Sequence, residues 1–306
     1  MKNLVQKYLS RIEVREPQRF RNIEIFPVFA DTNGKLEFLT LAEAFQRQLA
    51  SVSEVSAAGS VPEVKVVNGG EVGTLLVEGE ELLGARQHRM VATSALVAAK
   101  SEITVPVACT EAGRWSYREP TFVHSGHISP LMLRQLNSTA VAAALKRWLG
   151  HKSDQSAIWK MVGSILRKAR VKSPTSALND VFSARAEELN VCRQSLQPLP
   201  DQTGVIVLVN GQVQGLDIVS SPRAHRALHP ELITSYALGA LLEEETPGTE
   251  RGREKVFSFL EEAGRVSESV YRAVGCGEDH RFEGGRIAGS ALVADGSVIH
   301  LSLYCN

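Results

Sequence analysis

The stretch VIVLVNGQVQGLDIV, residues 205–219, carries the strongest local structural signal in the chain. Two runs rich in apolar and β-branched residues, Val205–Val209 and Val213–Val219, flank the pair Asn210-Gly211. A two-residue turn between antiparallel strands needs positive φ angles at both positions, and asparagine followed by glycine adopts them readily. The stretch therefore predicts an antiparallel hairpin, which requires no contact with any distant part of the chain.

Similar turn pairs predict two more hairpins. Asn-Gly and Asp-Gly pairs join Ile23–Ala30 to Leu36–Leu41 and Ile287–Ala294 to Val298–Tyr304. Further strands are expected before residue 110, separated by Gly-rich or charged turns. They are Pro62–Val67, Thr74–Val77, His88–Val97 and Ile103–Cys109.

Helical periodicity replaces the strand pattern between Pro130 and about Asn190, where apolar residues recur every three or four positions. Ser129 is the expected cap of the first helix, with Pro130 in its first turn. Ser221-Pro222 begins another helix, which we expect to restart at Pro230, and Arg251–Glu262 forms a further one.

Hairpin-joined strands around a helical block favour the α+β class over a doubly wound parallel sheet. We therefore expect a mostly antiparallel, hairpin-built sheet with a helical block in the middle and helices near the C-terminus. The length of 306 residues allows one large domain. Our prediction is a single α+β domain over 1–306, with 130–200 as a helical insertion or subdomain.

The charge and composition exclude several classes of protein. Lys plus Arg and Asp plus Glu each number 34, so the formal net charge is zero, which disfavours a general nucleic-acid binder. The N-terminus has no apolar signal segment, and no run approaches the roughly 20 apolar residues of a membrane helix. The four cysteines are far apart and form no CxxC pair, so no disulfide scaffold is expected. These features predict a cytoplasmic protein that does not bind membranes.

Residues 76–117 read LVEGEELLGARQHRMVATSALVAAKSEITVPVACTEAGRWSY. This segment, together with GSALVADGSVIHLSLY at 289–304, resembles the ARG-and-rhodanese-phosphatase-superfamily-associated protein domain family. Its pattern contains (D/E)GEEL-x-GA(K/R)Q-(N/H)-R and (V/I)PV-x-C-x-E-x-GRW-x-Y. The resemblance implies a link to NAD or ADP-ribose metabolism through associated ADP-ribosylglycohydrolase-like and phosphatase-like proteins, and it supplies no catalytic residues. His88 stands where we expect asparagine in the family's Q-N-R triplet, and only histidine titrates near neutral pH.

Two clusters in this segment carry the candidate chemistry. Carboxylates close together, or close to arginine, can be driven to different protonation states, which suits general acid–base catalysis. The candidate catalytic residues are Glu80, Glu81 and Glu111. Cations and an aromatic face suit a phosphate and a base. The candidate ligand-binding residues are Arg86, Gln87, His88, Arg89, Arg114 and Trp115. The alternative is a structural network of cross-strand Glu–Arg pairs, with Trp115 filling the core.

Other reactive side chains give weaker signals. His124-x-x-His127 and the pair His225 and His229 have spacings that are common by chance, so we expect polar loops or satisfied histidines and assign no metal or cofactor. A loose C-terminal group is interpreted in the same way: Cys276, His280, His300 and Cys305. Cys109 follows an apolar strand and is expected to be a small buried side chain rather than a nucleophile.

The charge is uneven along the chain. Between Lys146 and Lys172 eight basic residues stand against Asp154 alone, with Trp148 and Trp159 among them. Between Glu243 and Glu262 seven acidic residues stand against three basic ones. The two segments are expected to pair within the fold or across a homodimer, although a basic helical face can also bind a polyanion.

Two functions remain open from the sequence. The first is binding or processing of an ADP-ribose-like or other phosphorylated small molecule, with an anionic ligand at the two clusters. The second is a non-catalytic interaction module that binds a protein or nucleic acid through the basic helical block.

Overall fold

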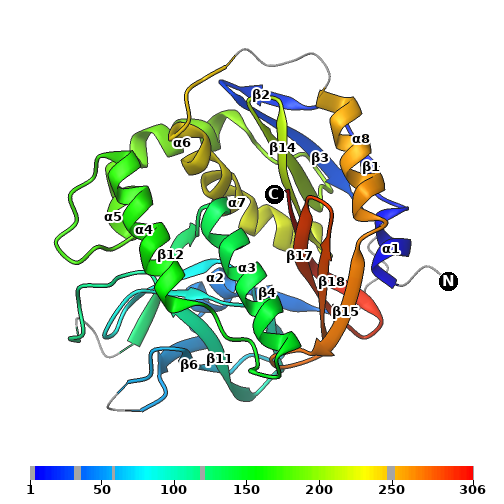
Figure 1. Ribbon diagram of the computed structural model, residues 1–306. Coiled ribbons are helices and arrows are strands. Elements are labelled where there is room, and N and C mark those ends of the chain that lie inside the picture. The colour runs from blue at the N-terminus through cyan, green and yellow to red at the C-terminus, as the bar shows by residue number, and fades with distance from the viewer. Residues whose placement is uncertain (1–3, 31–35, 57–58, 118–120, 247–251, 306) are drawn as a thin grey trace. The chain divides into compact units, whose positions relative to one another are not determined.

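The computed structural model describes residues 4–30, 36–56, 59–117, 121–246 and 252–305. Within these ranges it has eight helices and eighteen strands in mostly antiparallel sheets, which confirms the predicted α+β class (Figure 1). None of the helices in these ranges is both long and apolar enough to span a bilayer. The chain divides into two compact units, the first comprising 1–36, 190–273 and 277–306 and the second 37–189 and 274–276. The predicted single domain with a helical subdomain stays a prediction.

The first unit is built on one antiparallel sheet. Its described strands are β1 (Glu13–Val14), β2 (Gln18–Phe20), β3 (Ile23–Phe29), β13 (Gly204–Val209), β14 (Gln212–Val219), β15 (Ser267–Arg272), β16 (Glu278–Gly284), β17 (Ile287–Ala294) and β18 (Ser297–Cys305). Their order is β1-β3-β13-β14-β18-β17-β16-β15, with β2 also paired to β3. Its helices are α1 (Leu4–Leu9), α7 (Pro222–Leu241) and α8 (Gly252–Ala263).

Two of the three predicted hairpins are confirmed. β13 pairs with β14 and β17 pairs with β18, and the turn residues Asn210, Gly211, Asp295 and Gly296 have φ angles of 49°, 68°, 49° and 68°. The predicted hairpin between 23–30 and 36–41 is wrong. β3 pairs with β1, β2 and β13, whereas β4 (Phe38–Thr40) pairs in parallel with β7 (Gly73–Leu76) in another sheet. The pair Asn33-Gly34 lies outside the described residues.

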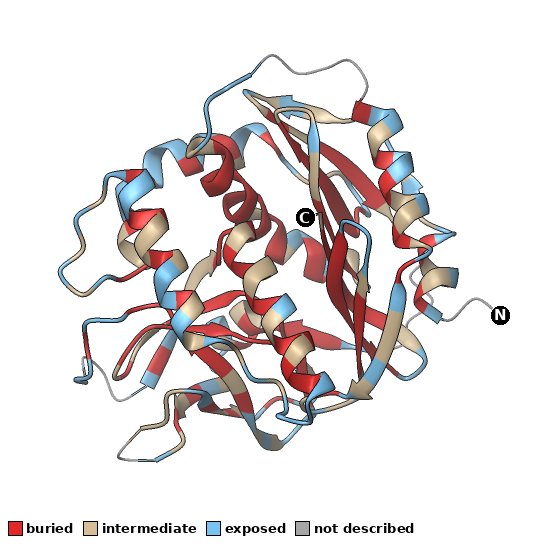
Figure 2. Cartoon of the chain, viewed as in Figure 1, coloured by how far each residue is buried: buried red, intermediate tan, exposed pale blue. Residues whose placement is uncertain are grey.

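Helices cover both faces of this sheet, so most of its strands are buried (Figure 2). α8 packs Val256 and Phe259 into an apolar cluster with Leu216 and Ile218 of β14. Asp217 alternates with these residues and faces α7 instead.

α7 begins as predicted, with Ser221 as its cap and Pro222 in its first turn, but it does not restart at Pro230. Leu228 and Leu232 are buried on either side of that proline, and their burial offsets the hydrogen bond that proline cannot donate.

The second unit contains a closed barrel of six strands in the order β11-β6-β5-β12-β8-β9. These strands are β5 (Ala50–Glu54), β6 (Glu63–Asn68), β8 (Glu80–Gly84), β9 (Arg89–Val91), β11 (Ser101–Cys109) and β12 (Thr121–Ile128). A separate sheet has the order β10-β7-β4, where β10 is Ala95–Val97. The predicted strand 88–97 is therefore two short strands in different sheets, because the chain turns between Val91 and Ala95.

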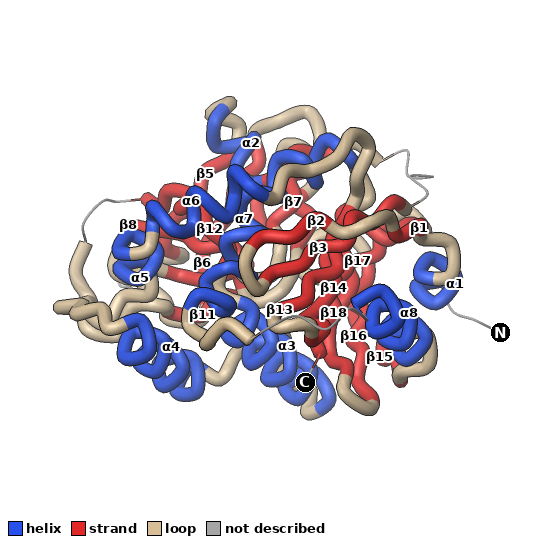
Figure 3. The backbone as a smooth tube through the Cα atoms, turned by 90° about the horizontal axis from the view of Figure 1, so that it is seen from above, coloured by secondary structure: helices blue, strands red, loops and turns tan. Residues whose placement is uncertain are grey.

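The helices of the second unit are α2 (Leu41–Gln46), α3 (Leu131–Lys146), α4 (Gln155–Ala169) and α5 (Asn179–Ala184), and α6 (Ala186–Ser195) contains the boundary between the units (Figure 3). An apolar core fills the barrel and includes Leu82, Val91 and Val107. Arg89 lies two residues before Val91 and so faces the same side of β9. Glu81 is the neighbour of Leu82 and faces the opposite side of β8.

Two glycines give a test of this architecture. A Cβ on Gly289 of β17 would lie 2.1 Å from the backbone oxygen of Ser302 in β18, whereas a Cβ on Gly296 would meet open space at a φ of 68°. We expect Gly289→Ala to lower the free energy of unfolding by roughly 3 kcal/mol or more, because the strand backbone must shift. Gly296→Ala is expected to cost only about 1 kcal/mol through its positive φ. Urea unfolding measures both, and equal losses would contradict the register of β17 and β18.

Candidate functional site

Glu81 is a carboxyl group without a cation partner among the described residues. It lies in β8 opposite Met90 of β9, which in turn lies opposite Ala108 of β11. Thr110 donates its hydroxyl to Glu81 Oε2 at 2.8 Å, and Ser129 donates to Oε1. The side chain is buried, and burial raises its pKa to about 7 although the two hydroxyl donors act in the opposite direction. Glu81 therefore changes its protonation state near neutral pH.

Ser129 does not cap the helix that follows it, so that prediction is wrong. α3 begins after Pro130 and has no side-chain cap. The Ser129 hydroxyl is instead used by Glu81, which is 48 residues away in the chain. An uncapped helix end costs about 1 kcal/mol, whereas a buried carboxyl without hydrogen-bond donors costs more.

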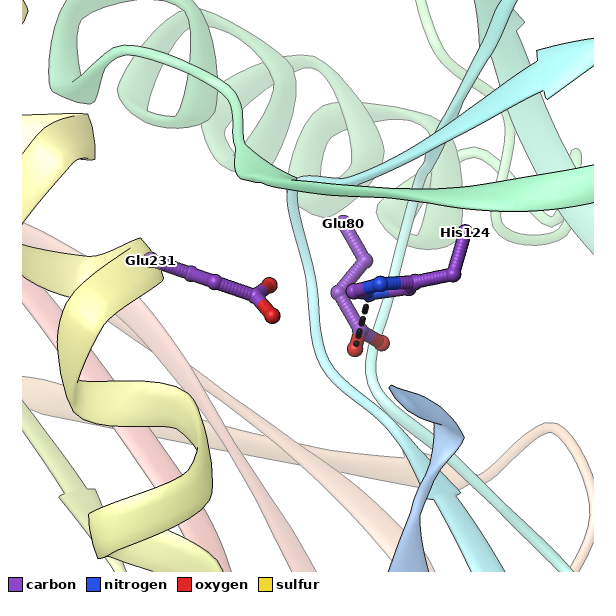
Figure 4. A group of neighbouring side chains, drawn as sticks. All are labelled: Glu80, His124 and Glu231. Atoms are coloured by element: carbon purple, nitrogen blue, oxygen red, sulfur yellow. Dashed lines mark ion pairs between the residues drawn. The ribbon is translucent and has the colours of Figure 1, made fainter. Parts of the chain in front are cut away.

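Glu80, at the start of β8, lies close to His124 of β12. Its Oε2 accepts the backbone N–H of Val77 at 2.7 Å, and its Oε1 lies 3.4 Å from His124 Nε2 (Figure 4). Gly126 donates its N–H to His124 Nδ1, so the neutral ring carries its proton on Nε2, facing Glu80. Glu80 and His124 offer two possible metal ligands, where a zinc site uses three or four.

Glu111 is buried in the ionised state. Arg114 contacts its carboxylate through Nε and through Nη2 at 2.6 Å, and the backbone N–H of His88 donates to it at 3.1 Å. Burial alone would raise the pKa of Glu111, but hydrogen bonds from Arg114 and Thr175 and the nearby His88 hold it below its ordinary value. The other donors of Arg114 bond the carbonyls of Gly84, Ala85 and Ser116. All five N–H groups of Arg114 are thus used inside the chain, and this residue positions Glu111.

Arg89 is fully buried and faces the barrel interior. Its Nη1 donates to Cys109 Sγ at 2.8 Å and to Gln87 Oε1 at 3.3 Å, and its Nη2 lies 3.6 Å from Glu54 Oε1. Burial raises the pKa of the Cys109 thiol to about 11, although the Arg89 charge opposes this shift. Cys109 is therefore a protonated thiol at neutral pH, as expected for a small buried side chain.

Trp115 does not fill the core. It is 44% exposed, as is Tyr117, so this part of the structural alternative is wrong. The guanidinium of Arg86 lies 5.6 Å from the Trp115 ring centroid and 4.3 Å from that of Tyr117. Together they form an accessible edge of two aromatic rings and one arginine, which suits a ligand with a flat ring and an anionic group.

The structure thus brings the two predicted clusters together through the pairing of β8, β9 and β11. However, it places individual members on different faces of the barrel wall, with Glu81 outside and Arg89 and Cys109 inside. Glu80 lies at the opposite end of β8 from Arg86 and His88. The roles assigned to these residues stay predictions.

The second unit contains a cavity of about 640 Å³ that no sequence motif indicated. Its walls include Pro62, Pro106, Val107, Lys152, Ser153 and Gln155. The loop before α4 supplies Lys152 and Ser153, α4 itself begins with Gln155, and these residues reach the cavity because α4 packs against β11. That packing joins residues more than 40 positions apart and leaves no local motif.

Two hydrogen-bonded chains connect the cavity wall to the buried groups. Gln155 accepts the backbone N–H of Cys109 at 2.7 Å and donates to its carbonyl at 2.9 Å. Ser153 donates to Asn137 at 2.6 Å, and Asn137 donates to Glu78 at 3.2 Å. A ligand in the cavity would therefore touch residues that already hold the buried network in place.

The first unit contains a further buried polar group that was missed from the sequence. Tyr236 of α7 donates to Asp217 Oδ2 at 2.7 Å, Ser302 donates to Oδ1, and His300 Nε2 lies 3.9 Å away. Polar residues at alternate positions of the apolar strands β14 and β18 were the available signal.

His225 and His229 bond to each other at 3.2 Å, and His229 bonds the Leu196 carbonyl at 2.9 Å. Burial, together with the neighbouring His229, lowers the pKa of His225 to about 3. This ring is therefore neutral under ordinary conditions.

These features define an α+β protein that buries a network of ionisable side chains and has a cavity of about 640 Å³ in its second unit. The chain belongs to the ARG and Rhodanese-Phosphatase-superfamily-associated Protein domain family, whose sequence profile matches residues 11–304. The resemblance in the 76–117 segment is thereby confirmed. Comparison with curated proteins and with solved structures gave no match.

The raised pKa of Glu81 predicts a dependence of stability on pH. Because the folded protein holds this proton up to about pH 7 and the unfolded chain loses it near 4.5, stability falls as pH rises between these values. Glu81→Gln removes this loss, so we expect it to match the parent near pH 4 and to be more stable at pH 8, by about 3 kcal/mol at most. Urea unfolding at both pH values measures the difference. The exposed control Glu187→Gln should show no such change, and a difference for Glu81→Gln that is equal at both pH values would contradict the shift.

Proposed function

We propose that this protein binds a phosphorylated, ADP-ribose-like small molecule and hydrolyses it or transfers a group from it, with Glu81 exchanging the proton. The observation that carries this proposal is the Glu81 carboxyl, buried between two hydroxyl groups with a pKa of about 7. A proton-transfer group works best when its pKa lies near the working pH. In a hydrolysis, neutral Glu81 would give its proton to the leaving oxygen and recover one from the attacking water.

The cavity supports the binding part of the proposal. Its volume of about 640 Å³ lies within the usual range for small-molecule sites. Pro62, Pro106 and Val107 give it apolar walls that suit a flat ring. Lys152 and the N-terminal end of α4 bring positive charge to the same cavity, which suits a phosphate.

The geometry of β11 favours an extended ligand over a simple anion. Pro106, which lines the cavity, and Thr110, which donates to Glu81, lie on one face by alternation, with Ala108 between them. Four residues of strand span about 13 Å. A ligand held at Lys152 would have to span that length, as a nucleotide-sized molecule can, and displace the packing that buries Ala108 and Glu81.

The family supports the same ligand class by context. Its description names an association with ARG and rhodanese-phosphatase proteins. Association with ADP-ribosylglycohydrolase-like and phosphatase-like proteins points to substrates that carry a phosphate and a ribose.

Thermal shift and turnover test the proposal together. We expect millimolar ADP-ribose to raise the Tm by a few degrees, since specific binding stabilises the folded state by mass action. Lys152→Glu should abolish the shift, whereas Glu81→Gln should keep the shift and lose any release of product measured by chromatography. Arg47→Glu, an exposed cation outside the cavity, serves as the matched control and should behave as the parent.

Two results would overturn the proposal. Absence of a shift with ADP-ribose, NAD, AMP and pyrophosphate, each at millimolar concentration, removes the ligand class. Full turnover by Glu81→Gln would show that Glu81 does not exchange the proton. The binding part of the proposal would then depend on the thermal shift of Lys152→Glu.

A further inference from the structure

Trp148 occupies a position that folding alone would give to glycine. It follows the end of α3 with a φ of 60°, and it is 91% exposed. Its N–H bonds the Leu145 carbonyl at 3.0 Å, and the Leu149 N–H bonds the Ala144 carbonyl at 3.0 Å. In this type of helix ending the left-handed residue is usually glycine, because a side chain there is strained. The backbone of Trp148 is therefore strained, and no burial of the ring offsets that strain.

The exposed ring belongs to a segment of the chain that is rich in exposed basic residues. We call residues 146–172 the basic corner. Its eight basic residues are all exposed, and Asp154 is its one acidic residue. Asp154 is engaged as the cap of α4, where it accepts the N–H of Ala157. The acidic residues of 243–262 have their described partners within the first unit, for example Arg21 with Glu245 and Arg286 with Glu262.

α4 presents its cations along one side. Ile158, Val162 and Ile165 are buried, so the apolar face of the helix is used inside the fold. Lys160 and Arg167 are exposed and lie seven residues apart, which places them on one side of the helix, and the exposed Trp159 is the chain neighbour of Lys160. At 1.5 Å per residue, Lys160 and Arg167 are about 10 Å apart along the axis. This row can follow a flexible phosphate backbone, and the ring of Trp148 is exposed on the loop that leads from α3 to α4.

We propose that the basic corner binds single-stranded nucleic acid, with Trp148 stacked on an unpaired base and the cations of α4 on the phosphates. Aromatic stacking combined with a basic track is the usual way in which proteins hold single strands. A duplex hides its base faces from such a ring. A lipid surface requires a free apolar helix face, which α4 does not have. An acidic peptide would use the cations but offers no flat partner to the ring.

The net charge of the chain is zero, so only the local charge of the basic corner attracts a nucleic acid. Salt screens this attraction, and binding should therefore weaken steeply as the salt concentration rises. Each phosphate contact contributes about 0.7 to the slope of log affinity against log salt for single strands.

Fluorescence anisotropy with a labelled mixed-sequence 12-nucleotide strand tests the proposal on the full chain. We expect the single strand to bind about tenfold more tightly than the corresponding duplex, with a strong decrease between 50 and 200 mM salt. Trp148→Gly should weaken binding about tenfold while raising the Tm, because glycine relieves the positive φ. This opposite effect on binding and stability separates recognition from folding.

Charge reversal supplies the matched control. The triple change Arg167→Glu, Lys168→Glu and Arg170→Glu should abolish binding, whereas Lys7→Glu, Arg226→Glu and Arg272→Glu alter net charge equally at exposed sites elsewhere and should weaken it only slightly. Glu81→Gln should bind the strand with the affinity of the parent. The test of strand binding is therefore independent of the test of the proposed enzymatic role of Glu81.

Several outcomes would overturn the inference. They are equal affinity for the duplex, unchanged affinity of Trp148→Gly, and equal losses from the two triple variants. Binding of a poly-glutamate peptide or an anionic vesicle in preference to the strand would assign the surface to a different partner and overturn it as well.

Discussion

A carboxyl group is stable inside a protein only when a cation pairs with it, when hydrogen-bond donors surround it, or when it keeps its proton. The second unit uses these solutions side by side. Glu111 stays ionised because Arg114 and the His88 N–H hold it. Glu81 has two hydroxyl donors and keeps its proton to about pH 7. Thr110, which donates to Glu81, is the chain neighbour of Glu111, so adjacent residues of the chain serve two carboxyl groups whose pKa values are shifted in opposite directions.

The barrel makes this arrangement possible. Some of its features could be predicted from the sequence, whereas those that depend on the register of its strands could not. Glu81, Arg89, Glu111 and Arg114, which the motif at 76–117 marks as candidate site residues, all make buried hydrogen bonds in the structure, and their catalytic or binding roles stay predictions. The motif could not show that Arg114 uses every donor within the chain, since two of its carbonyl partners, Gly84 and Ala85, lie about 30 residues away at the end of β8 and just after it. Nor could it separate the faces of the strands, which depend on β8 pairing with β9 and β9 with β11. The cavity could not be predicted from the sequence, because Gln155 contacts Cys109 only once α4 packs on β11.

For the fold, the predictable features were local and the unpredictable ones joined distant residues. The turns at Asn210-Gly211 and Asp295-Gly296 form hairpins because their preference for positive φ acts on adjacent residues. The parallel pairing of β4 with β7 and the closure of the barrel carry no such local signature. Ser129 is an example at a single residue. Capping rules consider only the residues of the helix, whereas the Ser129 hydroxyl donates to Glu81, which is distant in the sequence. Pro230 likewise ends a helix in isolation but not where buried side chains on both sides hold α7 to its sheet.

Carbon-13 NMR of the glutamate side-chain carboxyls measures the protonation state of Glu81 directly. With glutamate labelled at the δ-carbon, we expect one resonance that titrates with a midpoint near pH 7 and that disappears in Glu81→Gln. We also expect Glu111 to stay ionised to lower pH than an ordinary glutamate. A Glu81 resonance that titrates near its ordinary value of 4.5 would show that the buried carboxyl does not hold its proton at neutral pH.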